Sequence, residues 1–463
     1  MAGSMIDQEP LPFIKAYLDH LQESLGSTHR LSRCQRIWLA FCLMGILMTN
    51  SIAWQKFERA SLKTYTKQAL SKMFRWSKIS WNKLLVSSVQ MILRKYGITN
   101  GTLVVDDKDL SRSKNAEHLH ALHKIKDKKT GGYVLGQNIV VLYLVTEKFC
   151  IPASFEFYAP DPVLSAWTKE NKKLKKQGVP KKDRPKEPDR SADYPKKYEI
   201  ALKLLREFAE RLPEIRINCV LADALYGNGV FIDEIEKIWP SVQVITQIRA
   251  NQKIRVGKKE IVCKDYFRSY QGWAHAVSIR GQKAINVTAG GARMHVCSHN
   301  KKRFIIALKY EGETEYRYLI ASNLTWNMKE VIQAYSLRWY IEVFFEDWSG
   351  YCGFCSMAKQ CGVEGSERPL ILSLLFDHCF LFHFRQQLFI ENKLPLATLG
   401  SLVEKSRFDA LCHFIKRIVY SEDPKQYLRH LEEISDDIFP CNHSKKHLSG
   451  LSGQMESALR KVA

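Results

Sequence analysis

The chain has 463 residues and a mass of 53.6 kDa, which allows about two to four domains with a sizeable core. Lys and Arg number 70 against 48 Asp and Glu, so the formal net charge is +22, while 45% hydrophobic residues exclude wholesale disorder. This balance fits a globular protein with a polyanionic partner. The 12 scattered Cys indicate reduced thiols in a cytoplasmic protein, and no apolar run is predicted to span a membrane.

Residues 1–98 are predicted to form a helical domain that binds DNA. Apolar residues recur there at helical spacing, as at Ile37, Phe41, Met44 and Met48. Within this region, residues 64–84 combine capping Thr residues, a short break and basic side chains. This pattern is compatible with a helix-turn-helix, although any small helical bundle gives a similar one.

The pattern changes to strands after Gly101. The apolar run 102–105 predicts a short strand that ends at Asp106 and Asp107, and β-type residues predict two more strands over 133–146 and 149–158. A basic tract follows at 169–197, with 12 Lys or Arg against 5 Asp or Glu. The tract is interpreted either as a solvated surface loop or as an arm that tracks DNA, and both can hold together.

Strands and helices alternate in the next part of the chain, which predicts a mixed α/β sheet. The predicted elements are a helix over 198–211, a strand over 217–222 that ends at Asp223, a helix over 231–238 and a strand over 242–248. Residues 249–321 lack helical periodicity and are predicted to be an all-β insertion. A long helix is expected over 327–348, and the C-terminal region 366–463 is expected to be helical.

One stripe of the expected helix over 327–348 combines a phenol, a base and an acid. Tyr335, Arg338 and Glu342 are three and seven positions apart, which places them within roughly 60° of one helix face. An acid after a first strand, another after a later strand and a third on a helix can hold two divalent cations for phosphodiester transfer. Mg²⁺ suits such oxygen ligands.

These residues carry a resemblance to a known family. Tyr335, Arg338 and Glu342 match the Y-R-E-K signature of bacterial insertion-sequence DDE transposases, and the runs 103–107 and 220–227 resemble the first-Asp and second-Asp motifs of that group. The resemblance implies a ribonuclease-H-like mixed sheet with flanking helices, formed by residues 99–248 and 322–365. It also implies cut-and-paste transposition that depends on Mg²⁺, for which Mn²⁺ can substitute. The substrate would be double-stranded DNA, both at the terminal inverted repeats and at the target, and the enzyme would act as a homodimer.

The resemblance assigns roles to individual residues. It implies that Asp107, Asp223 and Glu342 ligate the metals. Asp106 remains the alternative for the first position, because adjacent residues of a strand point to opposite faces. Tyr335 and Arg338 match positions that grip phosphates. Trp339 matches an aromatic that stacks on a flipped base, and a packing role explains it equally well.

The chain departs from the signature at one position. Six residues separate Glu342 from Ser349, where the signature has Lys, so this phosphate contact is weaker or comes from another residue such as Lys359. Two alternative functions stay open: a catalytically silent, transposase-derived DNA-binding regulator, and a metal-dependent DNA nuclease without strand transfer.

Cys352 and Cys355 have zinc-knuckle spacing but lack a second pair.

Overall fold

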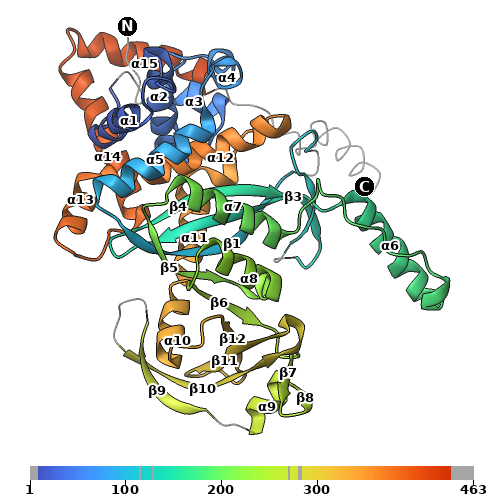
Figure 1. Ribbon diagram of the computed structural model, residues 1–463. Coiled ribbons are helices and arrows are strands. Elements are labelled where there is room, and N and C mark those ends of the chain that lie inside the picture. The colour runs from blue at the N-terminus through green and yellow to red at the C-terminus, as the bar shows by residue number, and fades with distance from the viewer. Residues whose placement is uncertain (1–8, 114–115, 128–129, 270–271, 280–283, 440–463) are drawn as a thin grey trace, which may run out of the picture.

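The computed structural model describes residues 9–113, 116–127, 130–269, 272–279 and 284–439 (Figure 1). The N-terminal part is helical, as predicted. Its helices are α1 (Pro12–Ser24), α2 (Arg33–Thr49), α3 (Trp54–Ala60), α4 (Lys67–Trp76) and α5 (Trp81–Lys95). The first strands follow as β1 (Asn100–Ser111), β2 (His123–Lys126), β3 (Tyr133–Val145) and β4 (Cys150–Tyr158).

The middle of the chain alternates helices and strands. It contains α6 (Pro162–Lys176), α7 (Lys197–Arg211), β5 (Arg216–Ala222), α8 (Gly229–Ile238) and β6 (Gln243–Ile248). The region that follows contains β7 (Lys253–Val256), β8 (Lys259–Val262), α9 (Cys263–Ser269), β9 (Trp273–Ser278), β10 (Ala284–Val296), β11 (Lys301–Tyr310) and β12 (Arg317–Ala321). The last helices are α10 (Met328–Ser336), α11 (Trp339–Tyr351), α12 (Gly362–Cys379), α13 (Phe384–Glu391), α14 (Leu399–Val419) and α15 (Pro424–Ile438).

A mixed sheet of 12 strands runs through the molecule in the order β2-β3-β1-β5-β6-β12-β11-β10-β7-β8, with β4 paired to β3 and β9 paired to β10. β5 is parallel to both β1 and β6, and the other described pairs are antiparallel. Carboxyl ends of parallel strands face the same edge, so the residues that follow Val105 in β1 and Ala222 in β5 come side by side.

β1 is longer than the sequence predicts. The strand was expected to end at Asp106, but it continues through both acids to Ser111. The long partner β3 supplies a ladder residue for each of these positions, so that Asp106 pairs with Val141 and Asp107 with Val140. The prediction was wrong because the apolar run marks only the buried half of β1, whereas the nonlocal pairing with β3 sets its length.

Residues 249–321 are not purely β. α9 forms within them and buries Cys263 and Phe267, which lie four positions apart on one helix face. The expectation of an all-β insertion is therefore wrong for this segment. The remaining strands extend the main sheet because β12 pairs with β6, and Figure 1 shows the strands of this region below the rest of the sheet.

The N-terminal and C-terminal helices pack together at one end of the molecule (Figure 1). α12 contacts both α2 and α5, and α5 contacts β4. The long apolar run in α12 is buried in this core. Among the residues that the structure describes, no helix is long and apolar enough to cross a membrane.

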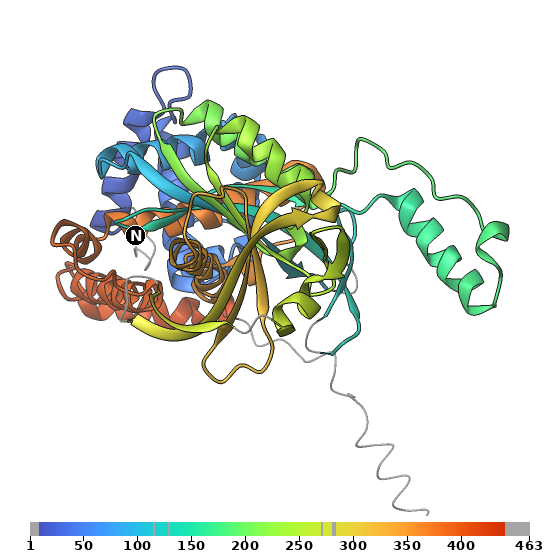
Figure 2. The ribbon, with the colours of Figure 1, turned by 60° about the horizontal axis from the view of Figure 1, so that its bottom comes forward.

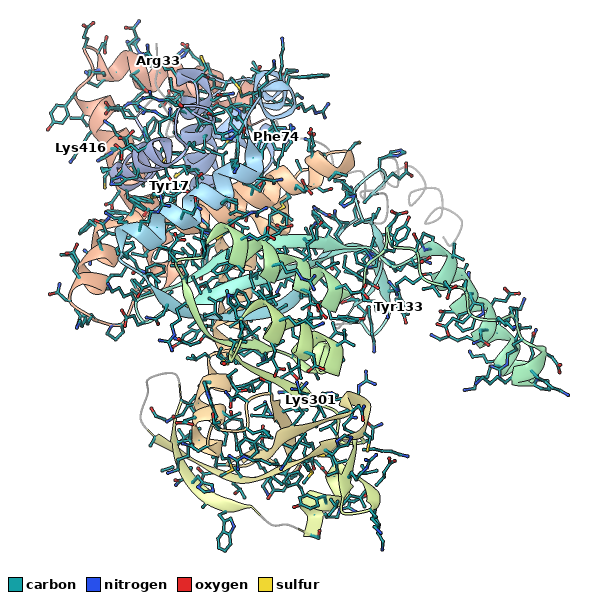
Figure 3. The ribbon with its side chains drawn as sticks, viewed as in Figure 1. Tyr17, Arg33, Phe74, Tyr133, Lys301 and Lys416 are labelled. Carbon is teal, nitrogen blue, oxygen red and sulfur yellow. The ribbon has the colours of Figure 1, made fainter. Side chains whose placement is uncertain are left out.

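A buried chain of hydrogen bonds joins these helices to the sheet. The Nε2 of His378 on α12 donates to the carbonyl of Pro152 on β4 at 2.9 Å, so its Nδ1 accepts from the Ser88 hydroxyl at 2.8 Å. Tyr17, which Figure 3 labels among the helices, donates to Ser88 at 2.7 Å. All four residues lie in the interior, and burial lowers the pKa of His378 to about 4.

His378 is expected to make the protein sensitive to acid. Its pKa is lower in the folded chain than in the unfolded one, so its contribution to stability is present above pH 6.5 and is lost as the pH falls to about 4, by about 3 kcal/mol. Urea unfolding between pH 7 and pH 4 should give a flatter pH dependence for His378→Gln than for the wild type. The control His413→Gln, at an exposed position, should keep the wild-type slope; an unchanged slope in His378→Gln would contradict the prediction.

Candidate active site

Two aspartates meet at the edge where β1 and β5 run parallel. Val105 pairs with Ala222, so Asp106 and Asp223 follow at neighbouring positions. Burial and, to a lesser extent, the nearby charge of Asp223 raise the pKa of Asp106 to about 7, although Arg338 lowers it in part. Burial also raises the pKa of Asp223, with a contribution from Asp107. The acids therefore repel one another in a poorly hydrated place, which favours a cationic partner.

Arg338 connects strand β1 to helix α11. Its guanidinium donates to Asp106 Oδ2 at 2.8 Å and also to Glu342 Oε1. The Arg338 and Asp106 side chains are only 16% and 15% exposed. The structure thus brings three predicted site positions together from β1 and α11, which are more than 200 residues apart in the sequence.

The expected long helix is broken at this point. α10 ends at Ser336 and α11 begins at Trp339, because the amides of Leu337 and Arg338 bond to carbonyls three residues back. The prediction of one continuous helix was therefore wrong. Arg338 and Glu342 still lie one turn apart and form an ion pair, while Tyr335 remains on the preceding helix.

Asp107 faces the opposite side of the sheet. Its Oδ2 accepts from the Lys197 Nζ at 2.8 Å and from the Asn138 Nδ2 at 2.7 Å. Asn138 also donates to Asp109 at 2.7 Å, as expected because residues 107 and 109 share one face of β1. Neither Lys197 nor Asn138 was predicted as a site residue. An Asn directly before the apolar run of β3 was the available signal for Asn138.

Tyr226 is a further residue that the sequence analysis did not single out. Asp223 Oδ1 accepts from the Leu225 amide at 2.8 Å and caps a short 3₁₀ turn, which carries Tyr226 into the interior. The Tyr226 hydroxyl is buried and has no hydrogen-bond partner among the described residues. Burial raises its pKa, and the charges of Asp107, Asp106 and Asp223 raise it further. The sequence signal for Tyr226 was its position in the run 220–227, which resembles the second-Asp motif.

The remaining predicted residues differ in their surroundings. The Tyr335 hydroxyl is buried without a hydrogen-bond partner in the described chain; burial raises its pKa, which Arg338 partly offsets. Trp339 is 42% exposed at the start of α11. The Ser349 hydroxyl donates to the Phe345 carbonyl of its own helix at 2.6 Å, and no hydrogen bond among the described residues joins it to the acids. The amine of Lys359 contacts Ser113.

The acids supply only oxygen donors, which suit a hard divalent cation. In this arrangement, however, Arg338 contacts Asp106 and Glu342. Within the described ranges, no three His, Cys, Asp or Glu side chains converge as a ready-made metal site. This also applies to the expected zinc pair, since Cys352 is buried and Cys355 is exposed.

The fold and the site define a mixed α/β protein with coupled carboxylates on its central sheet. Residues 24–284, more than half of the chain, match the profile of the family described as DDE superfamily endonuclease, and the chain belongs to this family. Membership makes it a nuclease-type enzyme, of a superfamily that generally uses divalent metals. The match includes both Asp106 and Asp223 but ends before Arg338 and Glu342. A comparison with curated proteins finds no match.

Removal of the Arg338 guanidinium should destabilise the fold. Arg338→Met leaves the partly buried Asp106 and Glu342 without their shared cation, and we expect a loss of about 2 kcal/mol at pH 7, measured by urea unfolding. Arg211→Met is the matched control, because its ion pair with Glu207 lies on the surface of α7 and should contribute less than about 0.5 kcal/mol. Equal midpoints for the two variants would contradict this account of the site.

Proposed function

We propose that the chain is a DNA transposase of the Y-R-E-K group that binds terminal inverted repeats, cleaves the transposon ends and joins them to target DNA. The observation that carries the proposal is the double contact of Arg338 with Asp106 and Glu342, next to Asp223, in a member of the DDE family. It links the base and the acid of the signature to the carboxylate of β1, the strand that runs parallel to the one preceding Asp223.

The sheet supports a ribonuclease-H-like core. β4, β3 and β1 are joined antiparallel, and β5 and β6 follow in parallel on the other side of β1. α7 packs on β3 and β4, whereas α11 contacts β1. The proposed catalytic acids therefore come from the centre of the sheet and from a helix that packs on it.

The donor chemistry supports a divalent-metal site formed by Asp106, Asp223 and Glu342. When bound, Mg²⁺ or Mn²⁺ would activate a water or hydroxyl and stabilise the leaving oxygen. We favour Asp106 over Asp107 for the first position, because Asp106 shares Arg338 with Glu342 while Asp107 is engaged by Lys197 and Asn138. The family pattern favours Asp107, so the two assignments need a direct test.

Basic side chains would let a polyanion approach these acids. Arg338 offsets two of the proposed ligands, Asp106 and Glu342, and Lys197 offsets the adjacent Asp107 at 2.8 Å. The buried Tyr335 hydroxyl, which lacks a partner in the described chain, can donate to a phosphate that enters beside Arg338. We assign Tyr335 and Arg338 to the DNA strand near the cleaved bond. We assign Trp339, which is 42% exposed, to stacking on a base, and Ser349 keeps at most a minor contact.

The N-terminal helices offer a surface for end recognition. α4 buries Leu70 and Phe74 and exposes polar side chains along a groove shared with α3. The exposed residues of this groove include Lys67, Gln68, Lys72, Arg75 and Trp76, the last of which is 77% exposed. Basic and amide side chains beside an exposed aromatic ring suit DNA. A homodimer that bridges two ends completes the proposal.

The two alternatives differ from this proposal in their products. A silent regulator binds DNA without cutting it, and a nuclease without strand transfer yields ends that never join. A single reaction with the DNA that flanks the gene, in Mg²⁺, separates all three when cuts and joined products are mapped at nucleotide resolution.

Loss of the helix acid should abolish cutting and spare binding. Glu342→Gln removes one negative charge from the proposed metal site but leaves the basic surface intact, so we expect at least about a 100-fold loss of cleavage with DNA affinity within about 2-fold of the wild type. Glu346→Gln, one turn further along α11 at an exposed position, is the control and should cut normally. Cleavage by Glu342→Gln at the wild-type rate would refute the assignment.

The two adjacent aspartates should behave differently. We expect Asp106→Asn to lose cleavage as completely as Glu342→Gln does, because it faces the same Arg338. Asp107→Asn, which loses only its contact with Lys197 and Asn138, should retain measurable cutting. Single-turnover cleavage of a pre-bound end would compare them. The reverse order would show that Asp107 is the ligand and that this face of the sheet carries the chemistry.

A further inference from the structure

The basic tract between β4 and α7 forms a projecting arm. Figures 1 and 2 show α6 standing away from the body of the molecule, followed by an extended segment that returns to α7. No residue of α6 is buried. Figure 3 shows its side chains reaching outward on several sides. The helix contributes nothing to the core, so its sequence is free to serve another purpose.

Hydrogen bonds hold the arm in a defined conformation. The Asp161 carboxylate at its root is 2% exposed and accepts from the amides of Val163 and Leu164 through one oxygen, and from the Ser191 amide at 2.9 Å through the other. A single side chain therefore ties the outgoing helix to the returning segment. Further out, the Trp167 Nε1 donates to the Pro185 carbonyl at 2.9 Å.

The helix has two opposite faces. Leu164, Trp167, Asn171 and Leu174 recur at helical spacing and are partly covered, and Arg184 of the returning segment donates to Asn171 at 3.1 Å. Four exposed lysines recur at positions three, four and seven apart on the other side: Lys169, Lys172, Lys173 and Lys176. At about 100° per residue they fall within roughly 100° of the helix circumference.

We propose that this lysine stripe binds the phosphate backbone of duplex DNA beside the active site. No acidic residue interrupts the stripe, and no ion pair engages these lysines in the described chain. α6 is about 22 Å long, which matches six or seven base pairs, and the stripe covers about 10 Å, or about three phosphates of one strand. Lysines that contact only phosphates hold DNA without reading its sequence.

The root of the arm places this contact near the chemistry. The returning segment ends at Lys197, the first residue of α7, whose amine contacts Asp107 at 2.8 Å. Asp107 is adjacent to Asp106 in β1, so a duplex that spans this edge of the sheet can reach both the proposed catalytic carboxylates and the arm. This inference rests on the proposed function, because it takes DNA as the substrate, and it adds a second contact surface to it.

The test removes the charge of the stripe and keeps the protein otherwise intact. The variant carries Lys169→Gln, Lys172→Gln, Lys173→Gln and Lys176→Gln, and the matched control carries Arg at the same four positions. Binding to a fluorescein-labelled 40-base-pair duplex of random sequence is measured by anisotropy between 50 and 200 mM salt. We expect the Gln variant to bind about 10- to 100-fold more weakly at 100 mM salt, with a log–log salt slope smaller by about 2 to 4, and the Arg variant to match the wild type.

Each outcome separates the arm from the rest of the proposal. Wild-type affinity and slope in the Gln variant would overturn the arm contact and leave transposition standing. Weaker binding by the Gln and Arg variants alike would also overturn it, because the loss would then not come from charge. Weaker binding by the Gln variant alone supports the arm contact. This conclusion holds even if Glu342→Gln still cuts DNA, a result that would refute the transposase assignment.

Discussion

The site depends on one guanidinium, which connects Asp106 of β1 to Glu342 of α11, two elements that already pack against each other. Arg338 lies in the turn between α10 and α11 and donates to Asp106 on β1 and to Glu342 one helical turn later. A planar fork with fixed donor directions suits two carboxylates that approach from different elements, a geometry that the single ammonium of lysine cannot reproduce. The break between the helices matters for this reason: it lets Arg338 reach the sheet while Glu342 remains anchored by the packed face of α11.

The pleat of β1 gives its two adjacent acids different neighbours. Asp106 faces α11 and its arginine, whereas Asp107 faces α7 and its first residue, Lys197. Each of the two adjacent acids therefore has its own cation, Arg338 for Asp106 and Lys197 for Asp107. Asp223 sits at the end of β5 beside both of them, and its charge contributes to the raised pKa of Asp106. A strand that carries two acids in succession can in this way connect the proposed chemistry on one face with the basic arm on the other.

The features that sequence reasoning predicted are those set by local physics. The apolar run that ends at Asp223 and the motif after it mark β5 and its turn, because burial and capping act over a few residues. The true end of β1 could not be predicted in this way, since its second half is held by pairing with β3. The helix break before Trp339 was equally hidden, because residues 327–348 contain no Pro and the apolar pattern continues across the turn. The choice between Asp106 and Asp107 needed the faces of the sheet, which the sequence leaves open.

The arm also explains part of the large positive charge. The tract 169–197 carries 12 basic against 5 acidic residues, and much of this excess stands on α6, a helix with no buried residue. An amphipathic helix usually directs its apolar side to a core. Here the covered side contacts the returning segment through Trp167 and Asn171, which stiffens the projection, and the lysines remain outside. A merely solvated loop needs neither this internal bracing nor a buried carboxylate at its root. The bracing is physically reasonable for an element that must present charge at a fixed distance from the acids, because a flexible arm would lose conformational entropy on each encounter with DNA.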